Sequence, residues 1–232
     1  MADHLTLHPW EVSPAEAVEL QQHLRTHIQL QPLHTPPTTI AGCDISFNKY
    51  EETVYAGIVV LRLDTLQVVE EVGVVSTAPF PYIPGLLTFR EGPALLEAWQ
   101  QLRTEPDVVM FDGHGIAHPR RMGIAAHMGL WLNRPAFGCG KSVLAGTFAP
   151  PALLRGAWAP LVHRGDTIGA ALRTKNKVNP VFVSPGHLID LPTVIELTLR
   201  CDGGYRIPEP TRQAHLQVNA LRRKYLQAGA GE

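Results

Sequence analysis

The sequence predicts an α/β protein with a mixed sheet, and three observations point to this class. Three strand-like runs, residues 39–47, 54–63 and 66–76, follow one another with short connections, which favours antiparallel neighbours. Helix-like and strand-like stretches then alternate, which is typical of parallel strands. The chain has 232 residues, 45% of them hydrophobic, which is enough to build a sizeable core. We therefore expect one domain over residues 1–232.

Local patterns predict the other elements in order. A first helix begins after Ser13, because Ser13, Pro14 and Glu16 form a capping signal. Its apolar stripe recurs at helical spacing: Ala17, Leu20, Leu24 and Ile28. The helix after the proline-rich turn is expected to end near residue 103, and three later helices are expected at 119–132, 191–201 and 210–226. Further strands are expected at 107–111, 136–138, 167–173 and 181–184. The order of the elements up to the 136–138 strand predicts a sheet that is antiparallel on one side and parallel on the other, and the last two strands complete the chain.

Composition restricts the class of protein. Cys43, Cys139 and Cys201 form no CxxC pair, which argues against a disulfide framework or a structural zinc site and favours the reducing cytoplasm. No secretory signal or apolar run of membrane-spanning length is visible, so we expect a soluble cytoplasmic protein, and a monomer. Up to Asp112 the chain has 5 Lys+Arg and 15 Asp+Glu, whereas the remainder has 15 and 6. Either the basic half faces a polyanion or the two halves attract each other.

Two aspartates suggest a metal site. Asp44 lies inside the 39–47 strand, on the face opposite to Cys43 and Ile45, where Asp is uncommon. Asp112 ends the 107–111 strand and precedes Gly113, at the end of a strand where open sheets bind ligands. A solvated strand face and an Asp-Gly turn are the simpler explanations. If the strands are neighbours, however, the two carboxylates need a cation between them, and all-oxygen ligands favour Mg²⁺ or Mn²⁺ over zinc.

Other residues extend this candidate site. Glu91, at the entry to a helix, is either a third ligand or a favourable helix-terminus charge. Lys141 follows glycine-rich residues like a phosphate-contacting lysine, although the P-loop spacing is absent. The last predicted helix places Arg212, His215 and Asn219 on one face. Carboxylates with a metal, and a lysine that offsets phosphate charge, are what metal-assisted phosphodiester hydrolysis requires.

Six motifs resemble the endonuclease V family. The run 80–93, FPYIPGLLTFREGP, closely resembles that family's signature. Five shorter motifs follow in order, so that the resemblance covers almost the whole chain: Asp112-Gly113-His114-Gly115, His118-Pro119-Arg120, Gly140-Lys141-Ser142, Ser184-Pro185-Gly186-His187 and Arg206-Ile207-Pro208-Glu209-Pro210-Thr211-Arg212. Two positions differ from or vary in the family: Gly140 replaces a more usual Ala, and His114 occupies a variable position.

The resemblance implies an RNase H-like fold and a DNA repair endonuclease. Such an enzyme nicks DNA at the second phosphodiester bond 3′ of a deaminated purine, chiefly deoxyinosine, leaving a 3′-OH and a 5′-phosphate. The implied cofactor is Mg²⁺, for which Mn²⁺ can substitute. The implied metal ligands are Asp44, Asp112 and Glu91, and Lys141 and His215 complete the implied catalytic set.

The resemblance also assigns residues to the lesion. Tyr82 is the implied wedge that fills the gap left by the displaced base, in a turn stiffened by Pro81 and Pro84. Stacking of an aromatic ring on exposed bases is worth about 1–3 kcal/mol. The full set implied to contact DNA or the lesion is Pro81, Tyr82, Ile83, Pro84, Gly85, Gly113, Gly115, His118 and Arg212. The glycines are expected to read hypoxanthine through backbone hydrogen bonds. A hydrophobic anchor beneath the loop is the alternative for Tyr82.

Two other functions stay open at this stage. The substrate can be inosine in RNA, which some members of the family prefer. The protein can also be a non-catalytic lesion-binding module, although a pure binder does not need the three acids Asp44, Glu91 and Asp112.

Overall fold

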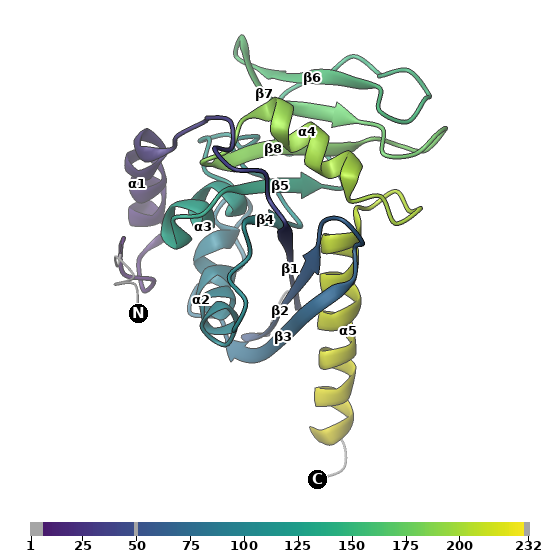
Figure 1. Ribbon diagram of the computed structural model, residues 1–232. Helices are drawn as coiled ribbons and strands as arrows, with labels where there is room; N and C mark the ends of the chain where they lie inside the picture. Colours follow the sequence, from purple (N-terminus) through teal and green to yellow (C-terminus); the bar gives the residue numbers. More distant parts are fainter. Residues whose placement is uncertain (1–6, 49–50, 230–232) are drawn as a thin grey trace.

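One eight-stranded mixed sheet forms the centre of the computed structural model, which describes residues 7–48 and 51–229 (Figure 1). The strands are β1 (Thr39–Phe47), β2 (Thr53–Arg62), β3 (Val68–Thr77), β4 (Val108–Phe111), β5 (Ala136–Gly140), β6 (Trp158–His163), β7 (Asp166–Leu172) and β8 (Val181–His187). Their order in the sheet is β3-β2-β1-β4-β5-β8-β7-β6. The α/β class and the antiparallel meander of β1, β2 and β3 are confirmed.

The parallel strands lie in the middle of the sheet. β4 is parallel to β1 on one side and to β5 on the other, whereas β8, β7 and β6 continue from β5 as antiparallel strands. The sheet predicted for the first five strands, antiparallel on one side and parallel on the other, is therefore confirmed, and the last three strands extend it with antiparallel pairs. The strand pair β6–β7 is a hairpin, and hairpins join antiparallel neighbours without a crossover helix.

Helices cover both faces of the sheet. They are α1 (Pro14–Leu24), α2 (Leu87–Gln100), α3 (Ile124–Leu132), α4 (Leu191–Arg200) and α5 (Glu209–Gly229), with a short 3₁₀ helix η1 (Arg25–His27) after α1. Leu95 of α2 and Met128 of α3 pack with one face of β4, and Val194 of α4 and Ala214 of α5 belong to the core on the other face. Burial on both faces explains why every residue of β4 is apolar. Among the described residues, no helix combines the length and the apolar character that a membrane crossing requires.

Two predicted helix boundaries differ from the structure. The Ser13–Glu16 capping box of α1 is confirmed, but α1 ends at Leu24, and Ile28 lies beyond it in extended backbone. The helix expected from residue 119 begins at Ile124 instead. Before it, Arg121 adopts a left-handed backbone with φ 61°, which interrupts any helix there.

Strand β6 was not predicted from the sequence. Its run Trp158–His163 contains Pro160, which lacks an N–H for a sheet ladder. β6 is the outermost strand of the sheet, and a proline is tolerated there because one edge of the strand needs no hydrogen-bonded neighbour.

Helix α5 lies across β1 at unusually close range. A Cβ atom on Gly42 would fall 2.0 Å from the carbonyl oxygen of Pro210, in the first turn of α5, so only glycine permits this approach. Asp44 points to the same face of β1 as Gly42 because side chains alternate along a strand. His215, one and a half turns after Pro210, is thereby brought to Asp44.

Candidate active site

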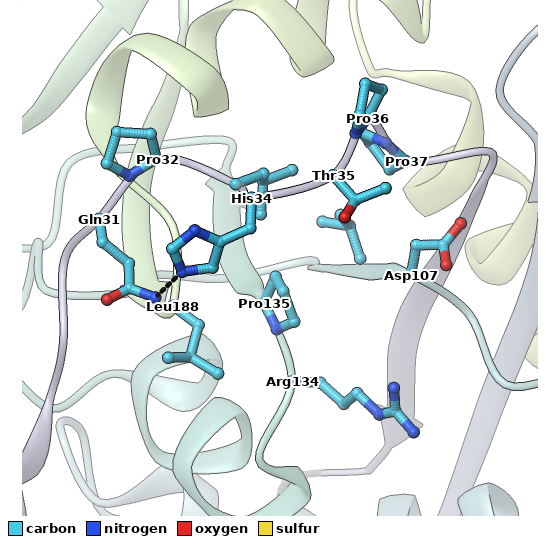
Figure 2. A pocket seen from close by; sticks show the side chains of 12 residues that line it. Gln31, Pro32, His34, Thr35, Pro36, Pro37, Asp107, Arg134, Pro135 and Leu188 are labelled. Carbon is cyan, nitrogen blue, oxygen red and sulfur yellow. Dashed lines mark hydrogen bonds between the residues drawn. The ribbon is translucent and has the colours of Figure 1, made fainter.

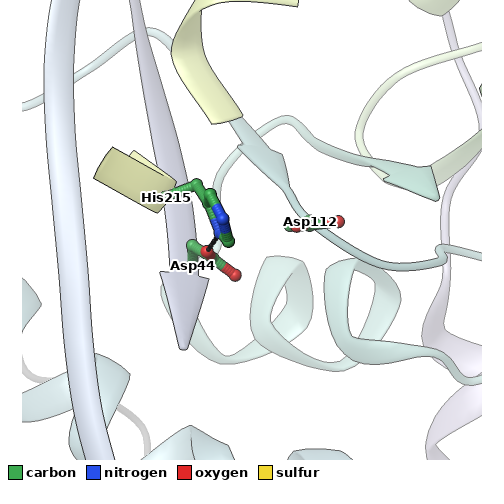
Figure 3. Close-up of side chains that lie close together, drawn as sticks. All are labelled: Asp44, Asp112 and His215. Atoms are coloured by element: carbon green, nitrogen blue, oxygen red, sulfur yellow. Dashed lines mark hydrogen bonds and ion pairs between the residues drawn. The ribbon is translucent and has the colours of Figure 1, made fainter. Parts of the chain in front are cut away.

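Two aspartates from adjacent parallel strands meet at the carboxyl end of β4. Cys43 of β1 is paired with Phe111 of β4, so Asp44 and Asp112 follow side by side, and the Asp112 N–H donates to the Cys43 carbonyl at 3.0 Å. With His215 of α5 they form a group whose potential ligand atoms all lie within 4.8 Å of one another (Figure 3). The predicted meeting of the two carboxylates is confirmed, and His215 joins them.

His215 and Asn219 hold the carboxylate of Asp44 from α5. The Nδ1–H of His215 donates to Asp44 Oδ2 at 2.7 Å, and Asn219 Nδ2 lies 3.1 Å from His215 Nε2. Asp44 Oδ1 accepts from the backbone N–H of Ile45 at 2.9 Å. His215 of α5 therefore orients Asp44, and Asn219 orients His215.

Glu91 projects toward the same carboxylates from α2. It lines a cavity of about 50 Å³ together with Asp44 and Asp112. Burial raises the pKa of Glu91 to about 8, and the charges of Asp44 and Asp112 add to the rise, against the opposing effect of Arg90. The helix begins at Leu87 and has no acid in its first turn, so a helix-terminus role does not explain Glu91.

The charges of this group suit a divalent cation. Burial raises the pKa of Asp44 to about 6, with a further contribution from the charge of Asp112. Lys141 Nζ donates to Asp112 Oδ2 at 2.5 Å; burial opposes the lysine charge, but Asp112 outweighs it and the pKa of Lys141 is raised. The raised pKa values of Glu91 and Asp44 mean that their ionised forms are disfavoured beside the single ammonium group of Lys141, and a divalent cation would offset that cost. Carboxylate oxygen atoms are the donors that hard divalent cations prefer, so the residues present fit such an ion.

The turn that carries Tyr82, residues 80–85, is held by hydrogen bonds at its first residue, Phe80. Buried Arg90 donates from Nη1 to the Phe80 carbonyl at 2.9 Å and from Nη2 to the Glu51 carbonyl, and its guanidinium lies 4.9 Å from the centre of the Phe47 ring. Tyr82 is 36% exposed, and its ring centre is 5.8 Å from that of Phe47. The tyrosine therefore projects from an anchored turn.

The last residue of the turn is held more firmly still. The Gly85 carbonyl oxygen accepts hydrogen bonds from Gln21 Nε2 at 3.0 Å, from His118 Nε2 at 3.0 Å and from Arg120 Nη2 at 2.8 Å. Gln21 also donates to the Met122 carbonyl at 3.2 Å and accepts from Arg120 Nε at 2.6 Å. Burial lowers the pKa of His118 to about 4, and the charge of Arg120 lowers it further, so the neutral imidazole is favoured.

A second cavity, of about 210 Å³, lies between this turn and the carboxylates. Its lining includes most of the residues that the sequence had linked to the lesion: Tyr82, Pro84, Gly85, Gly113 and His118. Glu91 and Asp112 line it too, so the cavity adjoins the acidic group. Ile83 packs instead on the small core of Phe80, Leu86 and Phe89, and Pro81 is exposed beside Tyr82.

Two of the expected lesion contacts are engaged elsewhere. The N–H of Gly115 donates to Ser184 Oγ at 2.8 Å, so it is not available to a base. Arg212 forms a two-pronged ion pair with Glu209, at 2.7 and 2.6 Å, and lies over the Tyr205 ring at 4.4 Å. Neither Gly115 nor Arg212 is among the described residues that line the cavity.

His114 and Gly140 are in contact. Gly140 is the residue that replaces the family's more usual alanine, and His114 occupies the variable position. A Cβ on Gly140 would fall 2.5 Å from His114 Cε1 and 2.8 Å from His114 Nε2. The partly buried imidazole therefore occupies the space that an alanine methyl group would need. The glycine is the residue that accommodates this histidine.

Gln21 and Arg90 were not predicted as site residues from the sequence. Gln21 lies on the buried stripe of α1, four residues after Ala17 and three before Leu24, and is 1% exposed. A polar side chain at a stripe position was the available signal, because such a group needs buried partners. Arg90 lay inside the recognised motif, but no local pattern indicated which carbonyl groups it binds.

A further cavity, of about 270 Å³, lies at the opposite end of β4 (Figure 2). It is bordered by residues 31–37, where Gln31 Nε2 lies 3.3 Å from His34 Nε2. Its charged groups are already paired: Asp107 accepts from the N–H groups of Thr38 and Thr39, and Arg134 pairs with Glu105. The candidate active site therefore lies at the carboxyl end of β4 and not at this end.

Comparisons with known proteins agree with this geometry. The family model described as Endonuclease V matches residues 22–216. The Endonuclease V of Myxococcus xanthus is 53% identical over 218 residues, covering 92% of each chain. The crystal structure of Endonuclease V from Bacillus subtilis is similar with a TM-score of 0.90 and 33% identity, over 96% of this chain and 98% of that one. Endonuclease V of Ciona intestinalis, solved in complex with a 24mer DNA containing an inosine followed by a ribo-adenosine, has a TM-score of 0.80 and 25% identity over 91% and 98% of the two chains. The chain belongs to the endonuclease V family.

Proposed function

We propose that this protein is a Mg²⁺-dependent DNA repair endonuclease that nicks at the second phosphodiester bond 3′ of deoxyinosine and other deaminated purines. The observation that carries this proposal is the position of the Asp44–Asp112–His215 group, beside a cavity closed by the Tyr82 turn. A site for phosphodiester hydrolysis thus adjoins a site for a displaced base. The inosine-containing DNA bound to the Ciona intestinalis relative supports the same substrate.

The carboxylates of Asp44, Asp112 and Glu91 would hold the metal, with His215 as a further donor or as the group that orients Asp44. When bound, a divalent cation supplies charge neutralisation at the phosphate and a more acidic water. Lys141, already beside Asp112, offsets negative charge on the scissile phosphate. Mn²⁺ suits the same oxygen donors and is expected to replace Mg²⁺.

The turn carries the recognition of the lesion. Tyr82 fills the gap that the displaced base leaves in the helix, and the cavity receives the base. Ties at Phe80 and Gly85 hold the turn before DNA arrives, so that inserting Tyr82 costs little ordering entropy. Gly85 and Gly113 remain as the glycines whose backbone borders the base, since the Gly115 N–H is engaged.

Cleavage mapping on a deoxyinosine duplex tests the proposal. We expect one nick at the second phosphodiester bond 3′ of the lesion, and only with a divalent cation. Asp112→Ala is expected to abolish the nick and to weaken Mg²⁺ binding in a calorimetric titration, whereas Asp64→Asn, at an exposed turn, matches wild type. Cleavage that persists in Asp112→Ala, or a wild-type protein that leaves the duplex intact, contradicts the proposal.

A second candidate substrate is inosine in RNA. The DNA in the Ciona intestinalis complex has a ribo-adenosine after the inosine, which shows that the relative binds a ribonucleotide at that position. We expect cleavage rates on matched deoxyribo- and ribo-inosine strands to favour DNA for this chain. A higher rate on the ribo-inosine strand reverses the assignment.

The single domain, the monomeric state and the cytoplasmic location also belong to this proposal. One continuous sheet runs through the described residues, which supports a single catalytic domain. The three cysteines are free and buried, which suits a reducing compartment. Sedimentation at the working concentration tests the monomer.

A further inference from the structure

A basic cavity lies next to the proposed lesion site but shares none of its lining residues. It measures about 370 Å³ and is formed by three segments that are distant in the sequence: the short helix η1, residues 119–121 and the β6–β7 turn. Its lining residues are Arg25, Thr26, Pro119, Arg121, His163, Arg164 and Asp166. Three guanidinium groups therefore face one carboxylate.

Two of the three arginines are available to a ligand. Arg25 and Arg164 are exposed, and among the described residues neither side chain has a hydrogen-bond or ion-pair partner. Arg121 is partly buried and is fixed by His163 Nδ1 at 2.8 Å, the His163 carbonyl at 3.0 Å and Asp166 Oδ2 at 3.1 Å. The cavity thus combines one guanidinium that is held in place with two that have no hydrogen-bond or ion-pair partner among the described residues.

The backbone is strained where two of these arginines project. Arg121 has φ 61° and Arg164 has φ 57°, a left-handed conformation that costs free energy in residues other than glycine. In Arg164 the conformation suits the tight turn between β6 and β7, which continues with Gly165 at φ 88°. Arg121 ends the turn in which its N–H donates to the His118 carbonyl at 2.9 Å, and its side chain reaches the β6–β7 hairpin.

One short segment of chain connects this cavity with the proposed lesion cavity. His118, Met122 and Gly123 line the lesion cavity, whereas Pro119 and Arg121 line the basic one. Residues 118–123 therefore border both cavities, so a strand whose base occupies the first cavity passes a basic site when it continues in that direction. Guanidinium groups pair with phosphate oxygens through charge-assisted, often two-pronged hydrogen bonds.

We propose that Arg25, Arg121 and Arg164 bind a backbone phosphate of the nucleic acid on the flank of the lesion. The inference rests on the proposed function in one respect, namely that the ligand of this protein is a nucleic acid. A phosphate contact positions the strand and reads no base, so it strengthens binding to damaged and undamaged DNA alike.

The salt dependence of binding tests this site. Affinities of wild type and of the double variant Arg25→Ala/Arg164→Ala are measured without divalent cation, on matched duplexes with and without deoxyinosine, from low to moderate salt. Each phosphate neutralised contributes about 0.9 to the slope of log K against log salt, so we expect the slope to fall by roughly that amount on both duplexes. At low salt the affinity is expected to fall by about tenfold, the effect of losing a charged hydrogen bond.

Two further variants separate the outcomes. Arg200→Ala removes one positive charge from α4, on the opposite face of the sheet, and is expected to keep the wild-type slope. Arg25→Lys/Arg164→Lys keeps both charges and is expected to keep most of the slope. A double alanine variant that binds like Arg200→Ala overturns the phosphate site. If the slope falls but wild type does not cut deoxyinosine DNA, the phosphate site stands and the proposed function fails.

Discussion

Replacing Gln21 with methionine removes three buried or partly buried hydrogen bonds beneath the Tyr82 turn while nearly preserving side-chain volume. The lost partners are the carbonyl groups of Gly85 and Met122 and the Nε–H of Arg120. We expect a less stable protein with a less well-positioned turn. The acidic group is not touched, because none of its members contacts Gln21.

The size of the effect follows from the partners. A neutral buried hydrogen bond contributes about 1 kcal/mol and one to a charged group about 2 kcal/mol. Gly85 keeps His118 and Arg120 as donors, and the methionine adds apolar contacts, so we expect a net loss of about 3 kcal/mol in the free energy of unfolding. The turn itself loses one neutral bond, which corresponds to a roughly fivefold higher KM for a deoxyinosine duplex.

Urea unfolding and steady-state cleavage measure the two effects separately. Gln22→Met is the matched control, because Gln22 is the next residue of α1 and is exposed; we expect it to change stability by less than about 0.5 kcal/mol. The reasoning fails if Gln21→Met is as stable as Gln22→Met. A fall in kcat at unchanged KM refutes the positioning of the turn, because it places the defect at the cleavage step.

Three other predictions concern recognition, packing and pH. Tyr82→Ala is expected to weaken binding to deoxyinosine DNA by about 1–3 kcal/mol while a metal titration remains unchanged; equal affinity in a binding assay contradicts the wedge. Gly140→Ala is expected to destabilise the protein by about 1–3 kcal/mol through its clash with His114. Adding His114→Ala to the same chain is expected to recover most of this loss, so additive effects of the two substitutions in urea unfolding argue against the contact. Burial, with a smaller contribution from the charge of His8, lowers the pKa of His127 to about 3. The stability that this neutral ring contributes is therefore complete above its unfolded pKa near 6.5 and is lost as the pH falls toward 3. At pH 5 the loss is about 2 kcal/mol, and urea unfolding of His127→Gln at pH 7 and pH 5 is expected to show a smaller pH dependence than wild type.

The sequence by itself determined the elements whose signals are local. The first strand was predicted with its observed bounds, and the cap of α1 and the buried strand β4 were also correct, because capping, alternation and apolar runs depend on neighbouring residues. Asp44 and Asp112 were found for the same reason, as acids in or after strands. The Tyr82 turn was found through its resemblance to a family signature, not through physics.

Only the tertiary structure decided how these parts meet. Strand order sets Asp44 beside Asp112, and the close approach of α5 at Gly42 brings His215 to them. The residues around Gln21 do not predict its hydrogen bond to the Gly85 carbonyl, 64 residues later in the chain. Hydrogen bonds of buried polar groups are satisfied by whichever segment folding brings into reach, and that information lies in the packing of the whole chain.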